Sequence, residues 1–415
     1  MNADEVRAEV AGWLAENWNP DRPLAEWRDI LVDSGWGCPT WPAEWFGKGL
    51  PPRVASVVDT EFSKVGAVGI APGQGITLAA ATILEHGSDH LKATFLKPAA
   101  TGKHRWCQLF SEPGNGSDLA GLTTRAERDG DEWVINGQKV WNTSAHKADF
   151  GMLVARTNVD VPKHKGITYF IIDMHQPGVE VRPLMQMNRY ATFNEVFFTD
   201  ARVPHANIVG TEGEGWRATL TTLASERFLP SVRTPSSSIS EDPGRCREEA
   251  MAEAKDYFST YVWYPQRAGR ADLLVRNAQE SGRVHEAVIR DRLGQVTSLD
   301  QTARWTAKRA QAAAKSGRAG PEGSIGKLVG SEIARQAAAL HGSIAGAHAM
   351  LNGPDSPLDG LVAEIIVSQP GQSIAGGTDQ IQRNIIGEKA LGLPREPAVD
   401  IDIPFRDVRT NTSRR

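Results

Sequence analysis

The sequence predicts an α+β protein with several domains, in which a helical region comes first, a β region follows and a second helical region ends the chain. Apolar residues recur at helical spacing near both ends, whereas residues 105 to about 210 contain closely spaced strand-like runs. The length of 415 residues also corresponds to about two to four domains. These two observations together set the fold class.

The composition is that of an ordinary globular protein and excludes several other classes. Charged residues make up 23% of the chain and apolar residues 40%, which excludes wholesale disorder. The formal net charge is −4, and a near-neutral balance argues against a nucleic-acid-binding protein. We expect no membrane span, because no run of about 18 apolar residues occurs. The acidic, amphipathic N-terminus is not typical of a signal peptide.

The cysteines indicate the redox compartment. Cys38, Cys107 and Cys246 form an odd and widely scattered set. Such a set excludes a disulfide framework and fits a reducing compartment. We therefore expect a cytoplasmic protein.

The N-terminal region, residues 1–104, is predicted to be an α-helical domain. Residues 3–32 show helical spacing, with Val6, Val10, Trp13 and Leu14 at i, i+4, i+7 and i+8. Residues 34–53 are dense in Gly, Pro and Trp, which predicts an irregular but packed connection. Helical spacing returns over residues 54–100, interrupted by the glycines of GIAPGQG.

The middle region, residues 105–213, is predicted to be a β domain. Its strand-like runs are WVINGQKVW, MLVART, ITYFIIDM, VEVRPL and EVFFTDARV. Asn136-Gly137 lies between two alternating runs and predicts a hairpin turn, because both residues tolerate positive φ. No helix intervenes between the runs, so the sheet should be antiparallel and form a barrel or a sandwich.

The C-terminal region, residues 214–405, returns to helical spacing. Its two longest predicted helices cover about residues 283–313 and 323–350. A Ser/Pro patch at residues 235–243 predicts a mobile loop within this region. Residues 406–415 are predicted to form a polar, disordered tail.

Searches for common nucleotide and metal motifs return nothing. Gly114, Gly116 and Gly121 do not have the dinucleotide-binding spacing, and PEGSIGKL lacks two essential positions of a phosphate-binding loop. The ten histidines are not spaced as metal ligands with cysteines or acidic residues. We therefore predict no metal site.

Two segments of the middle region carry more information. They read CQLFSEPGNGSDLAG over residues 107–121 and NGQKVWNTSAHKADFGMLVART over residues 136–157. Ser111, Ser117 and Thr143 offer hydroxyls, glycines expose backbone N–H groups, and Trp141 offers a flat apolar wall. Such a surface can hold a heteroaromatic ring and its phosphates. Serine-rich turns beside a tryptophan are also common structural features, so these residues alone leave both roles open.

These segments resemble the acyl-CoA dehydrogenase family of flavoproteins. SEPGNGSD is similar to the family's flavin-proximal loop, and KVWNTSAH is similar to its ring-contacting strand. The resemblance covers about residues 30–400, in the family's order. The further similar stretches are GWGCPTWPAEWFGKG, KHKGITYFIIDM, PGVEVRPLMQM, FNEVFFTDARVP, GEGW and AGGTDQIQRNIIGEKALGLPREP.

The resemblance implies a fold, a cofactor and a reaction. The implied fold is a helical N-domain, a middle antiparallel β-barrel and a C-terminal four-helix bundle. The implied cofactor is FAD, bound between the barrel and the bundle of one subunit and touching a neighbouring subunit. The implied reaction removes hydrogen between the α and β carbons of an acyl-CoA: a base takes the α proton and the β hydrogen leaves as hydride to the flavin. The electrons would then pass to an electron-transfer flavoprotein.

The resemblance also implies the cofactor-binding residues. Ser111 and Thr143 would lie at the polar edge of the flavin ring with Trp141 against it, and Ser117 would bind the pyrophosphate. The helix that begins after Gly376-Gly377 could reach the phosphates with its N-terminus, which favours anionic groups. The alternative for this segment is a plain capped helix start with Thr378 as N-cap. The full predicted set is Phe110, Ser111, Gly116, Ser117, Trp141, Thr143, Gly377, Thr378 and Gln380.

The catalytic base follows from the same resemblance. Many family members carry a Glu immediately before the Gly-Thr of the C-terminal motif, but this chain has Gly376 there. A minority branch places the base before an Arg in the first helix of the C-terminal domain, and LASERF matches it with Glu226 and the adjacent Arg227. The alternative for Glu226 is a surface residue paired with an arginine. Asp379 and Glu388 are the runner-up carboxylates.

Two stretches depart from the family pattern and leave the assembly open. RAGRADLLVRN stands where relatives carry the Arg-x-Phe-Gly that reaches a neighbour's FAD, and LHGSIAGAHAM replaces a glycine-rich segment. Some bacterial relatives that act on steroid side chains share these features and assemble from two different subunits. The chain is therefore expected to form a homodimer or homotetramer, or a heterotetramer with a related subunit.

Other interpretations also stay open. Pro230, four residues after Glu226, either widens the acyl pocket by kinking the helix or belongs to a loop insertion. The alternative functions are a non-catalytic or half-site subunit of a hetero-oligomeric acyl-CoA dehydrogenase, and a flavin oxidase or monooxygenase on the same fold.

Overall fold

The computed structural model describes residues 1–228, 244–315, 320 and 322–409, and their contacts divide the chain into two compact units. Unit 1 contains Met1–Leu184, Ala191–Thr260 and the segment that begins at Val399. Unit 2 contains Met185–Tyr190 and Tyr261–Ala398. The predicted order of a helical region, a β region and a second helical region is confirmed.

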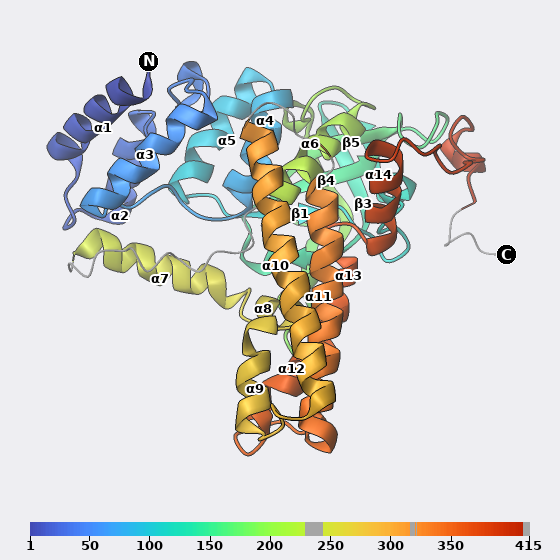
Figure 1. The fold of residues 1–415 in the computed structure, drawn as a ribbon. Coiled ribbons are helices and arrows are strands. Elements are labelled where there is room, and N and C mark those ends of the chain that lie inside the picture. Colours follow the sequence, from blue (N-terminus) through green and yellow to red (C-terminus); the bar gives the residue numbers. More distant parts are fainter. Residues whose placement is uncertain (229–243, 316–319, 321, 410–415) are drawn as a thin grey trace. The chain divides into compact units, whose positions relative to one another are not determined.

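Helices build the N-terminal part of unit 1 and the stretch after its sheet (Figure 1). Val6, Val10 and Leu14 are buried on one face of the first helix, as their spacing predicts. The last glycine of GIAPGQG begins a π-helical turn, Gly75–Ala80. The helices are α1 (Ala3–Asn17), α2 (Leu24–Asp33), α3 (Pro52–Val65), α4 (Ala81–His86), α5 (Asp89–Thr101), α6 (Gly215–Phe228) and α7 (Arg245–Ser259).

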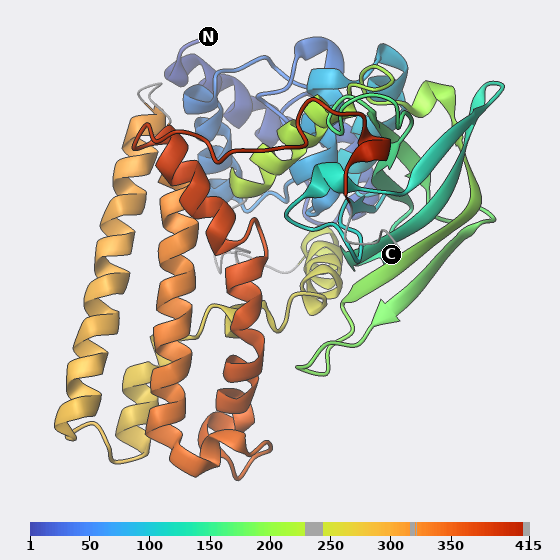
Figure 2. The same cartoon turned by 90° about the vertical axis from the view of Figure 1, so that its right-hand side faces the viewer.

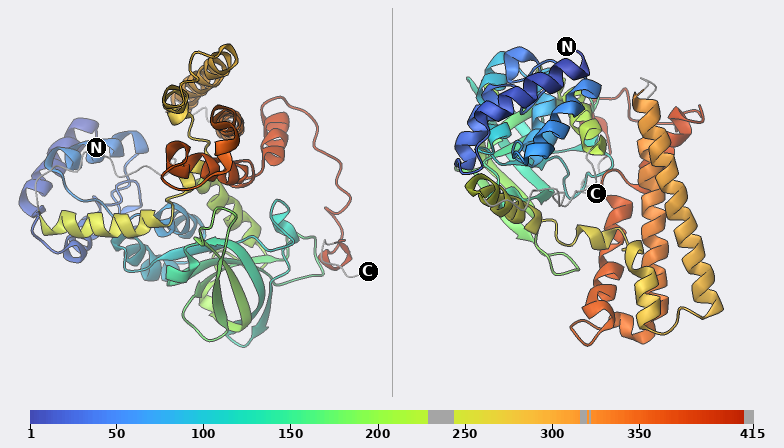
Figure 3. Two further views of the ribbon diagram at one scale, coloured as in Figure 1. Left: turned by 90° about the horizontal axis from the view of Figure 1, so that it is seen from below. Right: turned by 60° about the vertical axis from the view of Figure 1, so that its left-hand side comes forward.

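A seven-stranded sheet forms the middle of unit 1, and it curls strongly (Figure 3, left). Its strands are β1 (Trp106–Leu109), β2 (Arg125–Asp129), β3 (Glu132–Thr143), β4 (Phe150–Arg156), β5 (Ile167–Asp173), β6 (Val179–Leu184) and β7 (Phe193–Pro204). The order is β1-β4-β2-β3-β7-β6, with β5 also paired to β4.

The prediction of an antiparallel sheet holds for most of these pairings. β2–β3, β3–β7, β4–β5 and β6–β7 are antiparallel. In contrast, β4 pairs in parallel with β1 and, through one residue pair, with β2. No hairpin joins these strands directly, because other elements lie between them in the sequence, and the chain can therefore return in the parallel direction.

The predicted hairpin at Asn136-Gly137 is wrong, because both residues lie inside β3. The turn between β2 and β3 occurs instead at Gly130, which has φ 63°. The register of β3 shifts between Ile135 and Gly137, so the dipeptide marks a β-bulge. A Cβ at Gly137 would lie 2.6 Å from Thr124 Oγ1, which explains why glycine stands there.

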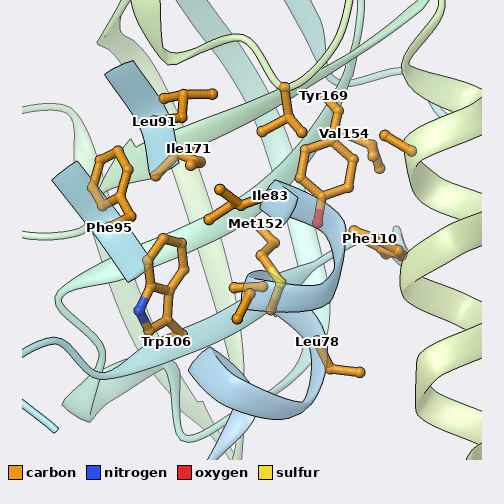
Figure 4. Packing of buried hydrophobic residues seen from close by; sticks show 14 of the residues in the cluster. Leu78, Ile83, Leu91, Phe95, Trp106, Phe110, Met152, Val154, Tyr169 and Ile171 are labelled. Carbon is orange, nitrogen blue, oxygen red and sulfur yellow. The ribbon is translucent and has the colours of Figure 1, made fainter. Parts of the chain in front are cut away.

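The largest apolar cluster of unit 1 lies between the helices and one face of the sheet (Figure 4). It joins Leu78 and Ile83 near α4, Leu91 and Phe95 of α5, and Tyr169 of β5. Ala218 of α6 belongs to the same cluster. This packing ties α6 to the sheet and to the N-terminal helices.

Unit 2 consists mainly of helices, and its two longest correspond to the predicted helices at 283–313 and 323–350 (Figure 2). Their shared core includes Leu293 and Val296 from one helix and Leu340 and Ile344 from the other. The helices are α8 (Tyr264–Arg267), α9 (Leu274–Glu280), α10 (Ala287–Lys315), α11 (Glu322–Ala345), α12 (Leu361–Ser368), α13 (Pro370–Ile374) and α14 (Asp379–Lys389). α11 contacts α10, α12 and α14.

Several predictions fall on residues outside this description. Pro230, residues 235–243 and residues 410–415 are among those that the structure does not describe. The prediction of a disordered tail from residue 406 is wrong at the start of that segment, because Phe405–Asp407 form a 3₁₀ turn and Arg406 N donates to the Val159 carbonyl. The domain boundaries predicted after residues 104, 213 and 405 stay predictions.

Candidate functional site

The loop after β1 presents the predicted flavin-side residues. Phe110 is buried, and its ring meets the Tyr169 ring edge-on with centroids 5.9 Å apart. Ser111 is half-buried, and its carbonyl accepts a hydrogen bond from Val140 N at 2.9 Å. Gly116 and Ser117 are exposed. The loop therefore begins in the core and ends in an open, polar turn.

A buried ion pair fixes the start of this loop. Lys139 of β3 is fully buried, and its Nζ donates to Glu112 Oε1 at 2.9 Å and to the Phe110 carbonyl at 3.0 Å. The Glu112 carboxylate also accepts hydrogen bonds from Thr123 and from Thr124 N. Burial alone would raise the pKa of Glu112, but Lys139 and these hydrogen bonds lower it to about 2. The Glu112 carboxylate is thus charged, and both of its oxygens accept hydrogen bonds.

Trp141 occupies a strained position on β3. Its φ is 64°, which is unusual for a bulky residue, and the strand register shifts between Lys139 and Asn142. Asn142 connects this part of β3 to β1, because its side-chain amide donates to the Gln108 carbonyl at 2.7 Å. The indole is 56% exposed and meets the Phe193 ring edge-on at 5.8 Å. The bulge therefore presents a large flat ring to the surface, and Thr143 follows two residues later.

Helix α6 carries Glu226 and is anchored by buried hydroxyls. Thr222 Oγ1 lies 2.7 Å from Thr82 Oγ1 and 3.1 Å from Tyr169 Oη. All three residues are at most 1% exposed. Glu226 is half-buried and lies one turn after Thr222, so both lie on the same face of the helix. The Tyr169 ring also contacts the Phe110 ring (Figure 4). One tyrosine therefore connects the flavin-side loop, which follows β1, to this helix.

The N-terminus of α14 in unit 2 carries the remaining predicted residues. Thr378 is the N-cap, and its hydroxyl accepts a hydrogen bond from Ile381 N at 3.3 Å. Gly376 and Gly377 have φ of 67° and 83°, the left-handed region that favours glycine. Gln380 is exposed. The structure places these residues in a different unit from Ser111, Trp141 and Glu226, and their role stays a prediction.

The two runner-up carboxylates already have other partners. Asp379 is 3% exposed and forms ion pairs with Lys327 at 2.9 Å and Arg335 at 2.7 Å. Burial by itself raises the pKa of Asp379, but the bonds from these cations hold it well below its usual range. Glu388 lies 3.5 Å from Arg395. A carboxylate held by two cations is a poor proton acceptor, which argues against Asp379 as the base.

The two stretches that depart from the family pattern meet at one buried histidine. His341 is fully buried; its Nδ1 lies 3.0 Å from the Asn277 amide, and its Nε2 lies 3.0 Å from the Arg270 carbonyl. Gly269 packs against the backbone of Ala334 with φ 80°. RAGRADLLVRN and LHGSIAGAHAM are therefore joined within unit 2 by a structural contact.

The family of this chain is shown by its similarity to known proteins. Family models match three segments: "Acyl-CoA dehydrogenase, N-terminal domain" over residues 2–103, "Acyl-CoA dehydrogenase, middle domain" over 107–201 and "Acyl-CoA dehydrogenase, C-terminal domain" over 271–391. The chain belongs to the acyl-CoA dehydrogenase family. Members of this family are FAD-dependent flavoproteins of lipid and steroid metabolism.

Individual acyl-CoA dehydrogenases are also similar to this chain. It is 32% identical to acyl-CoA dehydrogenase IpdE1 of Mycobacterium tuberculosis, covering 95% of this chain and 99% of that protein. It is 36% identical to acyl-CoA dehydrogenase FadE34 of the same organism over 94% of this chain, but spans only about half (49%) of FadE34. The ChsE4-ChsE5 complex of M. tuberculosis contains a chain with 28% identity and a TM-score of 0.64, covering 95% of this chain and 98% of that one.

The surface around Trp141 fits a flavin. The exposed indole offers a stacking face, and the nearby Ser111 and Thr143 offer hydroxyls to a polar ring edge. A Cβ at Gly116 would meet nothing within 4 Å, so the backbone there is open to a phosphate. The Asn142 and Asn194 side-chain oxygens are buried and have no hydrogen-bond partner in the described part of the chain. No group of described His, Cys, Asp and Glu residues could hold a metal ion.

The structure also shows residues that the sequence reasoning missed. Lys139, Glu112, Tyr169 and Thr222 support the candidate site without belonging to the predicted set. A lysine inside a predicted strand, next to the apolar Val140, was a usable signal, because a lysine that is buried there requires an anionic partner. Thr222 gave no such signal. Among the described helices, none has the length and apolar character needed to cross a membrane.

Proposed function

We propose that this chain catalyses the FAD-dependent α,β-dehydrogenation of an acyl-CoA thioester, with Glu226 as the base that removes the α proton. The observation that carries the proposal is the placement of Glu226 on α6, one turn after Thr222. The resemblance of LASERF to a minority branch of the family implies the base at this position. Tyr169 connects that helix to Phe110 at the start of the flavin-side loop. The base and the cofactor loop thus share one buried support.

FAD, when bound, supplies the acceptor for the β hydrogen, which leaves the substrate as hydride. Proton removal and cofactor binding depend on the protein's own residues. Glu226 would take the α proton onto its carboxylate. Trp141, Ser111 and Thr143 would hold the cofactor ring, and the Gly116–Ser117 turn would hold its pyrophosphate. Preorganised donors of this kind stabilise charge that develops during the reaction.

The other carboxylates are less suited to this role. Gly376 stands at the position of the more common base and has no side chain to act. Asp379 is engaged by Lys327 and Arg335, so its proton affinity is low. These observations argue against Gly376 and Asp379 as the position of the base. Arg227 follows it in the chain, and we propose that its charge favours the ionised carboxylate.

The substrate and the acceptor are inferred from the family. Because the chain resembles mycobacterial acyl-CoA dehydrogenases over nearly its whole length, we infer a thioester of lipid or steroid side-chain metabolism. We infer an electron-transfer flavoprotein as the acceptor and a cytoplasmic location.

The assembly is inferred as a heterotetramer with a related subunit, with a homodimer or homotetramer as the alternative. Two observations support it: the similarity to a chain of the ChsE4-ChsE5 complex, and the departure from the family pattern at the two segments around His341. Purification of the chain alone, followed by a count of flavin per protomer, separates these assemblies. One FAD in every protomer would contradict the hetero-oligomer.

The reaction is tested by anaerobic titration of the purified protein with linear, branched and ring-bearing acyl-CoA thioesters. The visible flavin absorbance should bleach with one of these classes. Glu226→Gln should keep FAD, but its rate of bleaching should fall by at least about 100-fold, the order of a general-base contribution. Glu388→Gln is the control and should bleach at the wild-type rate. Bleaching of Glu226→Gln at the wild-type rate would refute the assignment. Flavin that ignores every thioester but reacts with oxygen would favour the oxidase or monooxygenase alternative.

A further inference from the structure

The C-terminal segment of the chain returns to unit 1 after α14. Residues 399–408, here called the C-terminal strap, pack on the loop between β4 and β5. Phe405 N donates to the Val161 carbonyl at 2.9 Å, and Arg406 N donates to the Val159 carbonyl at 3.0 Å. In Figure 2 the short red turn before the C-terminus lies beside the teal loops of the middle region. The strap therefore packs on a loop of the sheet in unit 1.

Phe405 forms the apolar anchor of the strap. It is 8% exposed, and the Arg156 guanidinium stacks on its ring with the Cζ atom 3.7 Å from the centroid. Arg156 is itself buried, and its Nη2 donates to the Ala120 carbonyl at 2.6 Å and to the Leu122 carbonyl at 3.4 Å. Arg156 thus connects Phe405 to the backbone of Ala120 and Leu122, which follow the flavin-side loop.

Asp400 forms a second, polar contact. Its Oδ2 accepts a hydrogen bond from Lys163 Nζ at 2.7 Å, and the same Nζ donates to both oxygens of Asp118 at 3.1 and 3.2 Å. Lys163 is 8% exposed. Burial lowers the pKa of Lys163, but the two carboxylates outweigh it and raise that pKa, so the amine stays charged. Asp118 directly follows Ser117 in the chain.

Both contacts converge on residues 118–122. They are also linked to each other, because Arg156 Nη1 donates to the Lys163 carbonyl. The other end of the loop is fixed by the Lys139–Glu112 ion pair. We propose that the C-terminal strap is a positioning element for the cofactor: it holds residues 118–122, keeps Gly116 and Ser117 in place for the pyrophosphate, and slows the release of FAD. This inference rests on the proposed cofactor role of that loop.

The first test removes the apolar anchor without changing charge. Phe405→Ala is compared with Ile403→Ala, a matched truncation of an exposed strap residue. The holoenzyme is diluted, and the rate of FAD release is followed by the rise in free flavin fluorescence. We expect Phe405→Ala to release FAD about tenfold faster, the effect of losing one good contact, and Ile403→Ala to release it within about twofold of wild type.

The second test removes the polar contact. Asp400→Asn is compared with Asp402→Asn, which changes the charge equally two residues away and has no ion pair among the described residues. The same release assay applies, and thermal unfolding of the FAD-free protein is measured in parallel. We expect Asp400→Asn alone to speed release several-fold while both variants unfold at the wild-type temperature, so that the effect belongs to the cofactor and not to general stability.

Ser117→Ala separates failure of the strap from failure of the cofactor assignment. If Ser117→Ala releases FAD faster but Phe405→Ala and Asp400→Asn release it at the wild-type rate, the strap proposal is overturned and the loop assignment stands. If Ser117→Ala also behaves as wild type, the cofactor role of the loop is refuted, and the strap proposal with it.

Discussion

Replacing Glu112 by glutamine tests the buried support of the candidate site. The Glu112 carboxylate accepts hydrogen bonds from Lys139 Nζ at 2.9 Å, Thr124 N at 2.9 Å, and Thr123 N and Oγ1 at 2.7 Å each. A glutamine amide can accept at one oxygen only, and Lys139 would be left fully buried without an anionic partner. Removal of one partner of a buried pair costs about 3–5 kcal/mol, so we expect Glu112→Gln to lower the free energy of unfolding by at least about 3 kcal/mol.

The assay is denaturant unfolding followed by far-UV circular dichroism. Glu127→Gln is the matched control, because Glu127 is exposed on β2 beside Arg125. It should shift the free energy by less than about 0.5 kcal/mol. The double variant Glu112→Gln/Lys139→Met should cost less than the two single changes added together, because it removes both buried charges. A Glu112→Gln protein as stable as the Glu127→Gln control would refute the reasoning.

The same pair predicts a dependence of stability on pH. The pKa of Glu112 is about 2 in the folded protein, below the ordinary value of 4.5. A lowered folded pKa gives stability that is present above pH 4.5 and is lost as the pH falls toward 2. The difference of 4.5 − 2 = 2.5 in pKa corresponds to about 3 kcal/mol. Wild type should therefore lose more stability than Glu112→Gln between pH 5 and pH 3; parallel loss in both proteins would contradict the assignment.

Three further changes test other parts of the structure. Thr222→Val should lower kcat for thioester oxidation about tenfold with FAD retained, because the Thr222 hydroxyl connects α6 to Thr82. Thr219→Val should change kcat less than twofold, because the Thr219 hydroxyl bonds the Gly215 carbonyl of the same helix. Equal effects in steady-state kinetics would show that the hydroxyl chain does not position the base. Gly137→Ala should destabilise the protein by about 2 kcal/mol or more in denaturant unfolding, because its Cβ would press on Thr124, and unchanged stability would contradict the bulge. All three cysteines are buried and free, and burial raises their pKa values, so a thiol reagent at pH 8 should label none of them until the protein unfolds.

The sequence by itself determined the order of the regions, the family and the outline of the candidate site. Local patterns were enough for this, because helical spacing such as Val6, Val10 and Leu14 reports which face a helix buries. The SEPGNGSD and KVWNTSAH segments were enough to propose a cofactor loop and strand without any knowledge of their contacts. One short local pattern misled: the dipeptide Asn136-Gly137 tolerates positive φ in a bulge as well as in a turn.

Only the tertiary structure decided which residues support the site. Glu112 and Lys139 are 27 residues apart, and Lys163 and Asp400 are 237 apart, so no local spacing connects them. Whether a buried charge is stabilising depends on the partner that folding brings within hydrogen-bond distance, which a periodic pattern does not encode. The same reason explains why the residues from 406 onward were predicted to form a tail. That stretch is polar, and the ring contact that holds the preceding Phe405 comes from Arg156, on a strand of the middle region.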